Sequence, residues 1–154
     1  MHAVYPVLSH DEISEIDNKL SCEVPLDYKN FLLHCSNGLS IFLNTLSFYG
    51  IRKKIDRDLE NAWQPFSIIS LNTIERIKDA RTYDFFIGGY NWDGSLLYID
   101  TKTNYVIRCS NKSVQPLNSW NNFEEMVTSE MKRIASLFDE NGNEKDVDIP
   151  TIPN

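Results

Sequence analysis

The feature that most constrains the fold of this chain is residues 85–108, which read F-F-I-G-G-Y-N-W-D-G-S-L-L-Y-I-D-T-K-T-N-Y-V-I-R. Three apolar runs are separated here by two short polar segments. The first segment contains Asp93-Gly94, which predicts a two-residue hairpin turn because both residue types tolerate positive φ. The second, residues 101–104, predicts another turn with Asn104 in the left-handed conformation. The stretch therefore predicts two successive antiparallel hairpins.

A two-residue turn would also determine the strand register, because it would place Gly88 opposite Ile99. The pair Gly88-Gly89 inside a strand indicates a β-bulge or the close approach of a helix. Shorter apolar runs predict further strands at residues 40–43, 46–51 and 66–70.

Capping patterns predict where the first two helices begin. Ser9-His10-Asp11-Glu12 is a capping box, in which Ser9 and Glu12 each bond the other's backbone N–H, and it predicts a helix over residues 10–20. Pro25 predicts the first helical position of a second helix. The pair Asn37-Gly38 would end that helix. Its apolar stripe is predicted to consist of Leu26, Phe31, Leu32 and Cys35.

Two more helices are predicted further along the chain. The segment Asn72-Thr73-Ile74-Glu75 resembles a second capping box and predicts a short helix that reaches Ala80. The last helix is predicted over residues 121–138. Its broad apolar face would comprise Phe123, Met126, Val127, Met131, Ile134, Leu137 and Phe138.

This order of elements indicates an α+β fold, because helices and hairpin-connected strands are segregated rather than alternating. We expect one antiparallel β-sheet of about five or six strands, with helices packed on one face and at its ends. A length of 154 residues fits a single domain over residues 1–154, with its core at about 10–138. The remaining segment, residues 139–154, is polar and acidic, and we expect an extended arm or a loosely held end.

The charge and composition exclude several classes of function. A net charge of −7 disfavours direct nucleic-acid binding, because such binders neutralise phosphates with Lys and Arg. An acidic surface suits a basic partner, or simply solubility. No apolar run approaches the ~20 residues of a membrane span, and the first residues do not resemble a secretory signal. Three cysteines without Cys-x-x-Cys spacing indicate free thiols in a reducing cytoplasm.

The residues predict no catalytic, cofactor or metal site. The histidines, His2, His10 and His34, are not accompanied by a recognisable nucleophile motif. His34 and Cys35 are neighbours whose side chains would diverge by about 100° on a helix, so we interpret Cys35 as a core residue. Residues 139–144 superficially resemble a calcium loop but lack its glycine position, so we interpret them as a turn. We expect no enzyme activity, no cofactor and no metal.

Two surface features favour contact with a partner. Trp92 lies at the predicted hairpin tip, and tryptophan is enriched at binding hot spots. Packing of Trp92 across the strand pair is an equal alternative. The basic residues between 52 and 57 are balanced by Asp56, Asp58 and Glu60, which indicates a solvated loop.

Several of these motifs together resemble the SUKH superfamily of Smi/Knr-like proteins. Residues 24–32 read V-P-L-D-Y-K-N-F-L and precede Asn37-Gly38, similar to the proline-led helix and Asn-Gly turn of that family. The Trp92-Asp93-Gly94 turn and the start of the closing helix, Phe123-Glu124-Glu125-Met126, resemble later parts of the same pattern. Val24 replaces the usual leucine. The resemblance covers roughly residues 10–138.

The resemblance implies a cytoplasmic bacterial immunity protein that acts without catalysis. Such a protein binds and neutralises a polymorphic or contact-dependent toxin domain, often a nuclease, encoded by an adjacent gene. Acidic charge would speed capture of a basic toxin cleft. We expect the contacts at Asp56, Asp58, Glu60, Trp92 and Asp93.

Two alternatives stay open at this stage. Other members of the family are signalling adaptors, so this chain is alternatively a regulatory adaptor that binds a host protein. A third hypothesis is an enzyme on small metabolites that uses Cys35 or Cys109 as nucleophile, which rapid alkylation of the folded protein would support. The residues leave self-association open.

Overall fold

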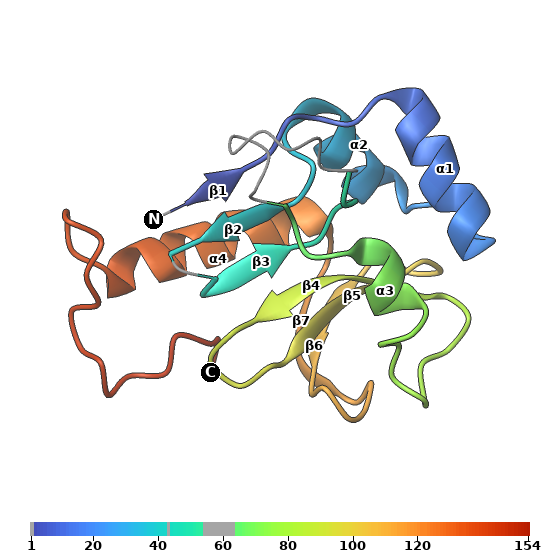
Figure 1. Cartoon of the computed structure of the whole chain (residues 1–154). Helices are drawn as coiled ribbons and strands as arrows, with labels where there is room; N and C mark the ends of the chain where they lie inside the picture. Colours follow the sequence, from blue (N-terminus) through green and yellow to red (C-terminus); the bar gives the residue numbers. More distant parts are fainter. Residues whose placement is uncertain (1, 43, 54–63) are drawn as a thin grey trace.

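The fold is built on an antiparallel meander, in which each strand pairs with the next along the chain (Figure 1). The computed structural model describes residues 2–42, 44–53 and 64–154. These residues form β1 (Ala3–Val4), α1 (His10–Leu20), α2 (Leu26–His34), β2 (Leu39–Ile41), β3 (Leu46–Phe48), α3 (Ile68–Asn72), β4 (Asp84–Tyr90), β5 (Leu96–Asp100), β6 (Val106–Cys109), β7 (Pro116–Trp120) and α4 (Phe123–Leu137).

This arrangement confirms the predicted α+β class and the antiparallel sheet. Seven strands occur among the described residues, rather than five or six. The additional strands are β1, which has only two residues, and β7, whose sequence P-L-N-S-W lacks a run of β-formers. No helix in the described part of the chain is both long and apolar enough to cross a membrane.

Helices α1, α2 and α4 supply the main core on one face of the sheet, which we call the helical face. Ile16, Leu32 and Met126 from these helices are fully buried against strand residues such as Ile87 and Leu97. The opposite face carries a smaller cluster from the sheet, α3 and the loops near it: Leu71, Ile77, Phe86, Tyr98, Ile107, Cys109 and Val114.

Helix α3 replaces a strand beside the first half of β4. The predicted strand at residues 66–70 is wrong: Ser67 accepts a hydrogen bond from Ser70 N–H (3.1 Å) and caps α3. The predicted capping box at Asn72 is also wrong, because α3 ends there. The Asn72 amide instead donates to Phe86 O (2.8 Å) and accepts from Phe86 N (2.9 Å). One side chain thus makes the two bonds that a neighbouring strand would make.

A second asparagine works in the same way where the chain leaves β3. The Asn37 amide donates to Ile51 O (2.9 Å) and accepts from Ile51 N (2.8 Å). Gly50 must be a glycine here, because a Cβ would lie 2.2 Å from Asn37 Oδ1. Gly38 takes the positive φ of 82° that ends the α2 turn, as the Asn-Gly pair predicts.

The β4–β5 hairpin has a longer turn and a different register from those predicted. Tyr90 N donates to Ser95 O (2.9 Å), so residues 91–94 form a four-residue turn. The longer turn places Gly88 opposite Leu97 rather than Ile99, and a bulge between Phe86 and Gly88 then shifts the register by one more residue, so that Phe86 pairs with Tyr98. The predicted bulge at the glycine pair is therefore confirmed. The close approach comes from β3, since a Cβ on Gly88 would lie 2.0 Å from Ser47 O.

The helices at the two ends of the chain follow their sequence signals, while α2 is rotated from its predicted face. The Ser9–Glu12 capping box begins α1, and Asn122 caps α4 within the predicted range of 121–138. In the second hairpin turn, Asn104 has the predicted left-handed conformation, with a φ of 63°. In α2, however, Pro25 is the N-cap, Leu26 is 70% exposed, and the buried residues are Tyr28, Leu32 and Leu33. The Tyr28 hydroxyl bonds the carbonyls of Tyr49 and Ile87, which turns its face of α2 toward the sheet.

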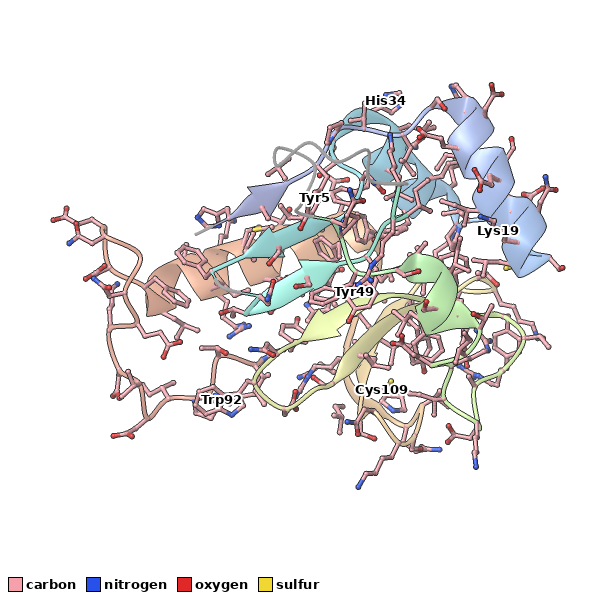
Figure 2. The ribbon with its side chains drawn as sticks, viewed as in Figure 1. Tyr5, Lys19, His34, Tyr49, Trp92 and Cys109 are labelled. Atoms are coloured by element: carbon pink, nitrogen blue, oxygen red, sulfur yellow. The ribbon has the colours of Figure 1, made fainter. Side chains whose placement is uncertain are left out.

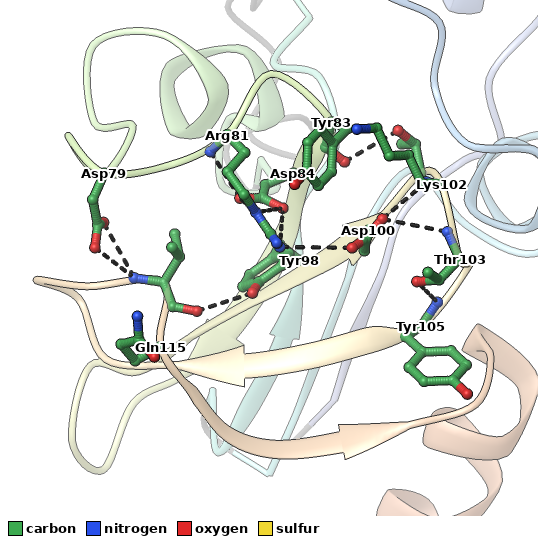
Figure 3. A network of polar contacts seen from close by, with 12 residues as sticks. Asp79, Arg81, Tyr83, Asp84, Tyr98, Asp100, Lys102, Thr103, Tyr105 and Gln115 are labelled. Carbon is green, nitrogen blue, oxygen red and sulfur yellow. Dashed lines mark hydrogen bonds and ion pairs between the residues drawn. The ribbon is translucent and has the colours of Figure 1, made fainter.

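One arginine bridges two carboxylates that face each other on the sheet (Figure 3). Asp84 and Asp100 lie directly opposite each other on β4 and β5, where like charges repel. Arg81 binds Asp84 (2.8 Å) and lies 3.6 Å from Asp100. The neighbouring Tyr98 hydroxyl donates to Val114 O (2.9 Å). This network holds the loops that cover the opposite face.

The acidic C-terminal segment is tied to the domain at its last residues. Arg133 on α4 donates to Thr151 O (2.8 Å), and Thr151 is buried. Arg108 on β6 donates to Pro153 O (3.2 Å). Figure 1 shows the segment leaving α4 and returning to the sheet. The described contacts favour a docked end over a loosely held one.

Replacing Asn72 by alanine should cost about 3 kcal/mol of unfolding free energy, because the buried N–H and C=O of Phe86 lose their partners. The control is Asn141→Ala, an exposed position where only the backbone N–H is bonded and where we expect a change within ~0.5 kcal/mol. Urea unfolding followed by circular dichroism measures both. Equal midpoints for the two variants would contradict the strand-replacing role of Asn72.

Deleting residues 150–154 should lower the unfolding free energy by about 2 kcal/mol, because two buried or half-buried arginines lose carbonyl acceptors. Pro153→Ala, which keeps the carbonyl, should leave stability close to that of the full chain. Thermal unfolding of the three proteins is the measurement, and an unchanged midpoint in the deletion would show that the docked end contributes nothing.

Candidate interaction surface

The β4–β5 turn presents the predicted hot-spot residue to solvent. The Asp93 carboxylate accepts from Ser95 N (2.9 Å), and Gly94 takes a φ of 69°, which together close the turn. Trp92 is 46% exposed. Figure 2 shows it at the free end of the hairpin, beside the path of the C-terminal segment. The structure therefore places Trp92 where a partner can reach it, and its part in binding stays a prediction.

Asp93, in contrast, is engaged inside the domain. Its carboxylate pairs with Arg108 at 2.6 Å. Partial burial opposes ionisation of Asp93, but the bonds from Ser95 and the charge of Arg108 hold its pKa below the usual value. A partner that binds the Asp93 carboxylate would have to compete with this ion pair. In the free protein, Asp93 therefore stabilises the turn.

Arg108 is the centre of a buried polar network on the helical face. It is 5% exposed and lies in β6, between β5 and the edge strand β7. Besides Asp93, it donates to Ser95 Oγ (2.8 Å), to Asn118 Oδ1 (2.7 Å) and to the carbonyl of Pro153. Four partners for one guanidinium satisfy most of its donors, which is how a buried charge is tolerated.

The network continues from Arg108 to α4. The Arg108 guanidinium lies 5.6 Å from the ring centre of Tyr90, whose hydroxyl donates to Glu130 (2.8 Å). Glu130 is almost fully buried and pairs with Arg133 at 2.6 Å. Burial and the nearby Glu130 charge raise the pKa of Tyr90 well above its usual value. This tyrosine is therefore a neutral hydrogen-bond donor at any physiological pH.

Sequence reasoning missed this network, although a signal exists. Glu130 lies four residues after Met126 and four before Ile134, which places it on the apolar stripe of α4. Arg108 interrupts the apolar run of β6. A charge on a buried face requires a partner, so the two residues were candidates for one internal network.

The acidic loop proposed from the sequence cannot be placed. Asp56, Asp58 and Glu60 lie outside the described residues. Their contact with a partner remains a prediction from sequence.

The thiols occupy different environments from those expected. Cys35 is exposed, so its interpretation as a core residue is wrong: the face of α2 that carries Tyr28 and Leu32 is turned to the sheet. Cys22 is also an exposed residue, and the partial burial of its thiol raises the pKa of that group. Cys109 is buried, and burial together with the charges of Asp79 and Asp84 raises its pKa to about 12. Neither shift favours a thiolate nucleophile.

No group of three or more His, Cys, Asp or Glu side chains that could hold a metal ion occurs among the described residues. An open groove of about 620 Å³ lies between α2 and α4. Its lining includes apolar Phe31, Phe123 and Val127 and acidic Asp27 and Glu124. His34 and Cys35 also line the groove, which is therefore an additional candidate surface of mixed apolar and polar character.

Comparison with known proteins connects this architecture to a family. Among curated proteins, no relative matches the chain. The SMI1 / KNR4 family (SUKH-1) matches it over residues 8–129, from just before α1 into α4. The match spans most of the chain and includes α1, α2, α3, the first half of α4 and all strands except β1, while the docked C-terminal segment lies outside it. The chain belongs to the SMI1 / KNR4 family (SUKH-1).

Proposed function

We propose that this protein is a cytoplasmic immunity protein that binds one cognate toxin domain and neutralises it by stoichiometric contact. The observation that carries the proposal is the family match over residues 8–129, because this family is known for immunity proteins. A toxin encoded by an adjacent gene is the expected partner. The mechanism is occlusion or distortion of the toxin's active site, without turnover of any substrate.

The charge of the chain supports a basic partner. It carries 22 acidic against 15 basic residues. Several of the described bases are already paired internally, among them Arg81, Arg108 and Arg133. The acidic side chains Asp27 and Glu124 line the α2–α4 groove. A nuclease toxin has a basic substrate cleft, and opposite charges accelerate its capture.

Co-expression tests the proposal directly. The toxin domain encoded beside this gene is expressed in cells with and without the protein, and the pair is then purified. Survival together with a one-to-one complex supports immunity by direct binding. Cell death despite good expression, with no complex, would reject this pairing and favour the regulatory adaptor of a host protein.

Reversing the charge of the predicted contact loop should slow capture of the toxin. We expect the triple variant Asp56→Lys, Asp58→Lys, Glu60→Lys to reduce the association rate at low salt by about tenfold or more, with a weaker dependence on ionic strength. Stopped-flow or surface plasmon resonance measures the rate at several salt concentrations.

The matched control changes three exposed acids of the C-terminal segment, Glu140→Lys, Glu144→Lys and Asp148→Lys, and so alters the net charge by the same amount. We expect a much smaller effect there. Equal rates for the two triple variants would remove the loop from the interface and leave only a general charge effect.

A further inference from the structure

A small hollow opens on the face of the sheet opposite the main helices. Ser47 lies between Leu46 and Phe48, which are buried in the helical core, so its side chain points to the opposite face. Gly89 on β4 pairs with Ser47 on β3. Because Gly89 has no side chain, the backbone forms the floor of the hollow at this point. The space measures about 240 Å³. Its lining comprises Asn44, Ser47, Tyr49, Phe66, Gly89, Tyr90, Asn91, Gly94, Ser95 and Leu96.

The floor of this hollow holds an unsatisfied hydroxyl. Ser47 is 4% exposed, and its Oγ is the buried side-chain polar atom that lacks a hydrogen-bond partner within the described residues. By contrast, the hydroxyl of the neighbouring Ser40 donates to Asn44, and that of Ser36 bonds the carbonyls of Tyr5 and Gly38. A buried hydroxyl without a partner costs free energy. A bound ligand that forms a hydrogen bond with Ser47 Oγ would remove this cost.

The lining defines the chemistry of that ligand. No Asp, Glu, Lys, Arg or His contributes to it, so a charged group would be buried without a counter-ion. One wall is aromatic: the rings of Tyr49 and Phe66 lie 5.1 Å apart, and Phe66 is 41% exposed. A flat, uncharged group with both a donor and an acceptor fits the aromatic wall and the serine hydroxyl together. A carboxamide has these properties.

The size of the hollow indicates one side chain rather than a whole small molecule, since sites for such molecules usually measure ~300–1,000 Å³. Its position favours a protein partner. Asn91, Gly94 and Ser95 of its lining flank or belong to the turn that carries exposed Trp92. Figure 2 shows Tyr49 beside β3 and Trp92 at the end of the hairpin. An aromatic anchor next to a one-residue pocket is the usual anatomy of a binding hot spot.

We propose that this hollow receives an asparagine or glutamine side chain from a loop of the toxin domain, with its carboxamide bonded to Ser47 Oγ and packed against Tyr49 and Phe66. The inference rests on the proposed immunity function and names the contact surface that the function uses. It adds the opposite face of the sheet to the interface, next to Trp92.

Ser47→Ala separates this role from a structural one. It removes a hydroxyl that makes no bond within the described residues, so the free protein should be as stable as the parent or more stable. The affinity for the toxin domain should fall by about three- to tenfold, the worth of one hydrogen bond. Phe66→Ala should weaken binding through loss of the aromatic wall. Calorimetric titration measures affinity, and thermal unfolding measures stability.

Ser36→Ala is the matched control, a buried serine whose hydroxyl is bonded inside the domain. We expect the reverse pattern there: lower stability and unchanged affinity of the folded protein. If Ser47→Ala binds the toxin as tightly as the parent does, the proposal is overturned even though immunity itself stands.

A second measurement does not depend on the toxin. Acetamide, acetate and methylammonium are titrated separately into the isotope-labelled protein, and amide chemical shifts are recorded. Saturable shifts at Gly89 and Ser95 with acetamide alone, weakened in Ser47→Ala, support the pocket. No shift with acetamide, or equal shifts with the charged probes, would refute it. If the parent protein fails to bind the toxin, the proposed function fails, and this titration still decides the chemistry of the hollow.

Discussion

The structure depends on side chains that replace a missing piece of β-ladder. Tyr49 N donates to Ile87 O, and before Ile87 no strand among the described residues pairs with this edge of β4. Buried backbone groups without partners would cost about 1–3 kcal/mol each. Asn72 and Asn37 each make a donor–acceptor pair with a backbone residue at this gap, and Tyr28 bonds two further carbonyls. Because these bonds hold α3 and α2 against the sheet, the two apolar clusters form on either side of it.

Charged side chains are likewise paired within the domain. Two networks pair arginines with carboxylates of the domain. Exposed Arg81 lies between Asp84 and Asp100, and buried Arg108 pairs with Asp93 and connects through Tyr90 to Glu130. Arg108 balances Asp93, and Arg81 offsets one of the two carboxylates beside it, so these networks shape loops. The excess of acids over bases is therefore left to the surface. The function proposed above uses this acidic excess to steer a basic partner into contact, and it rests on membership of a family known for immunity proteins.

Local signals predicted those parts of the fold that local bonds determine. The capping box at Ser9 begins α1 because both of its bonds lie within four residues, and Asn104 turns the second hairpin because its own φ permits it. The strand predicted at residues 66–70 was wrong because an apolar segment of that length suits a strand or a short helix equally. The hydrogen bond by which Ser67 caps the segment stabilises the helix. The hairpin register failed because Asp93 pairs with Arg108 on another strand, which favours a four-residue turn over the local two-residue one.

The candidate surface divides in the same way. From sequence alone came the place of Trp92 at a hairpin tip, the acidic balance and the resemblance to the family, since each depends on residue type and order. Only the tertiary structure shows that Asp93 pairs with Arg108, that Cys35 faces outward, and that the Ser47 hydroxyl, beside Gly89, lacks a hydrogen-bond partner within the described residues. By itself, then, the sequence determined helices α1, α2 and α4, the presence of two hairpins and the antiparallel α+β class, because these follow from bonds between near neighbours. The tertiary structure decided the register, the rotation of α2 and the place of the hollow, because these depend on contacts between residues far apart in the chain.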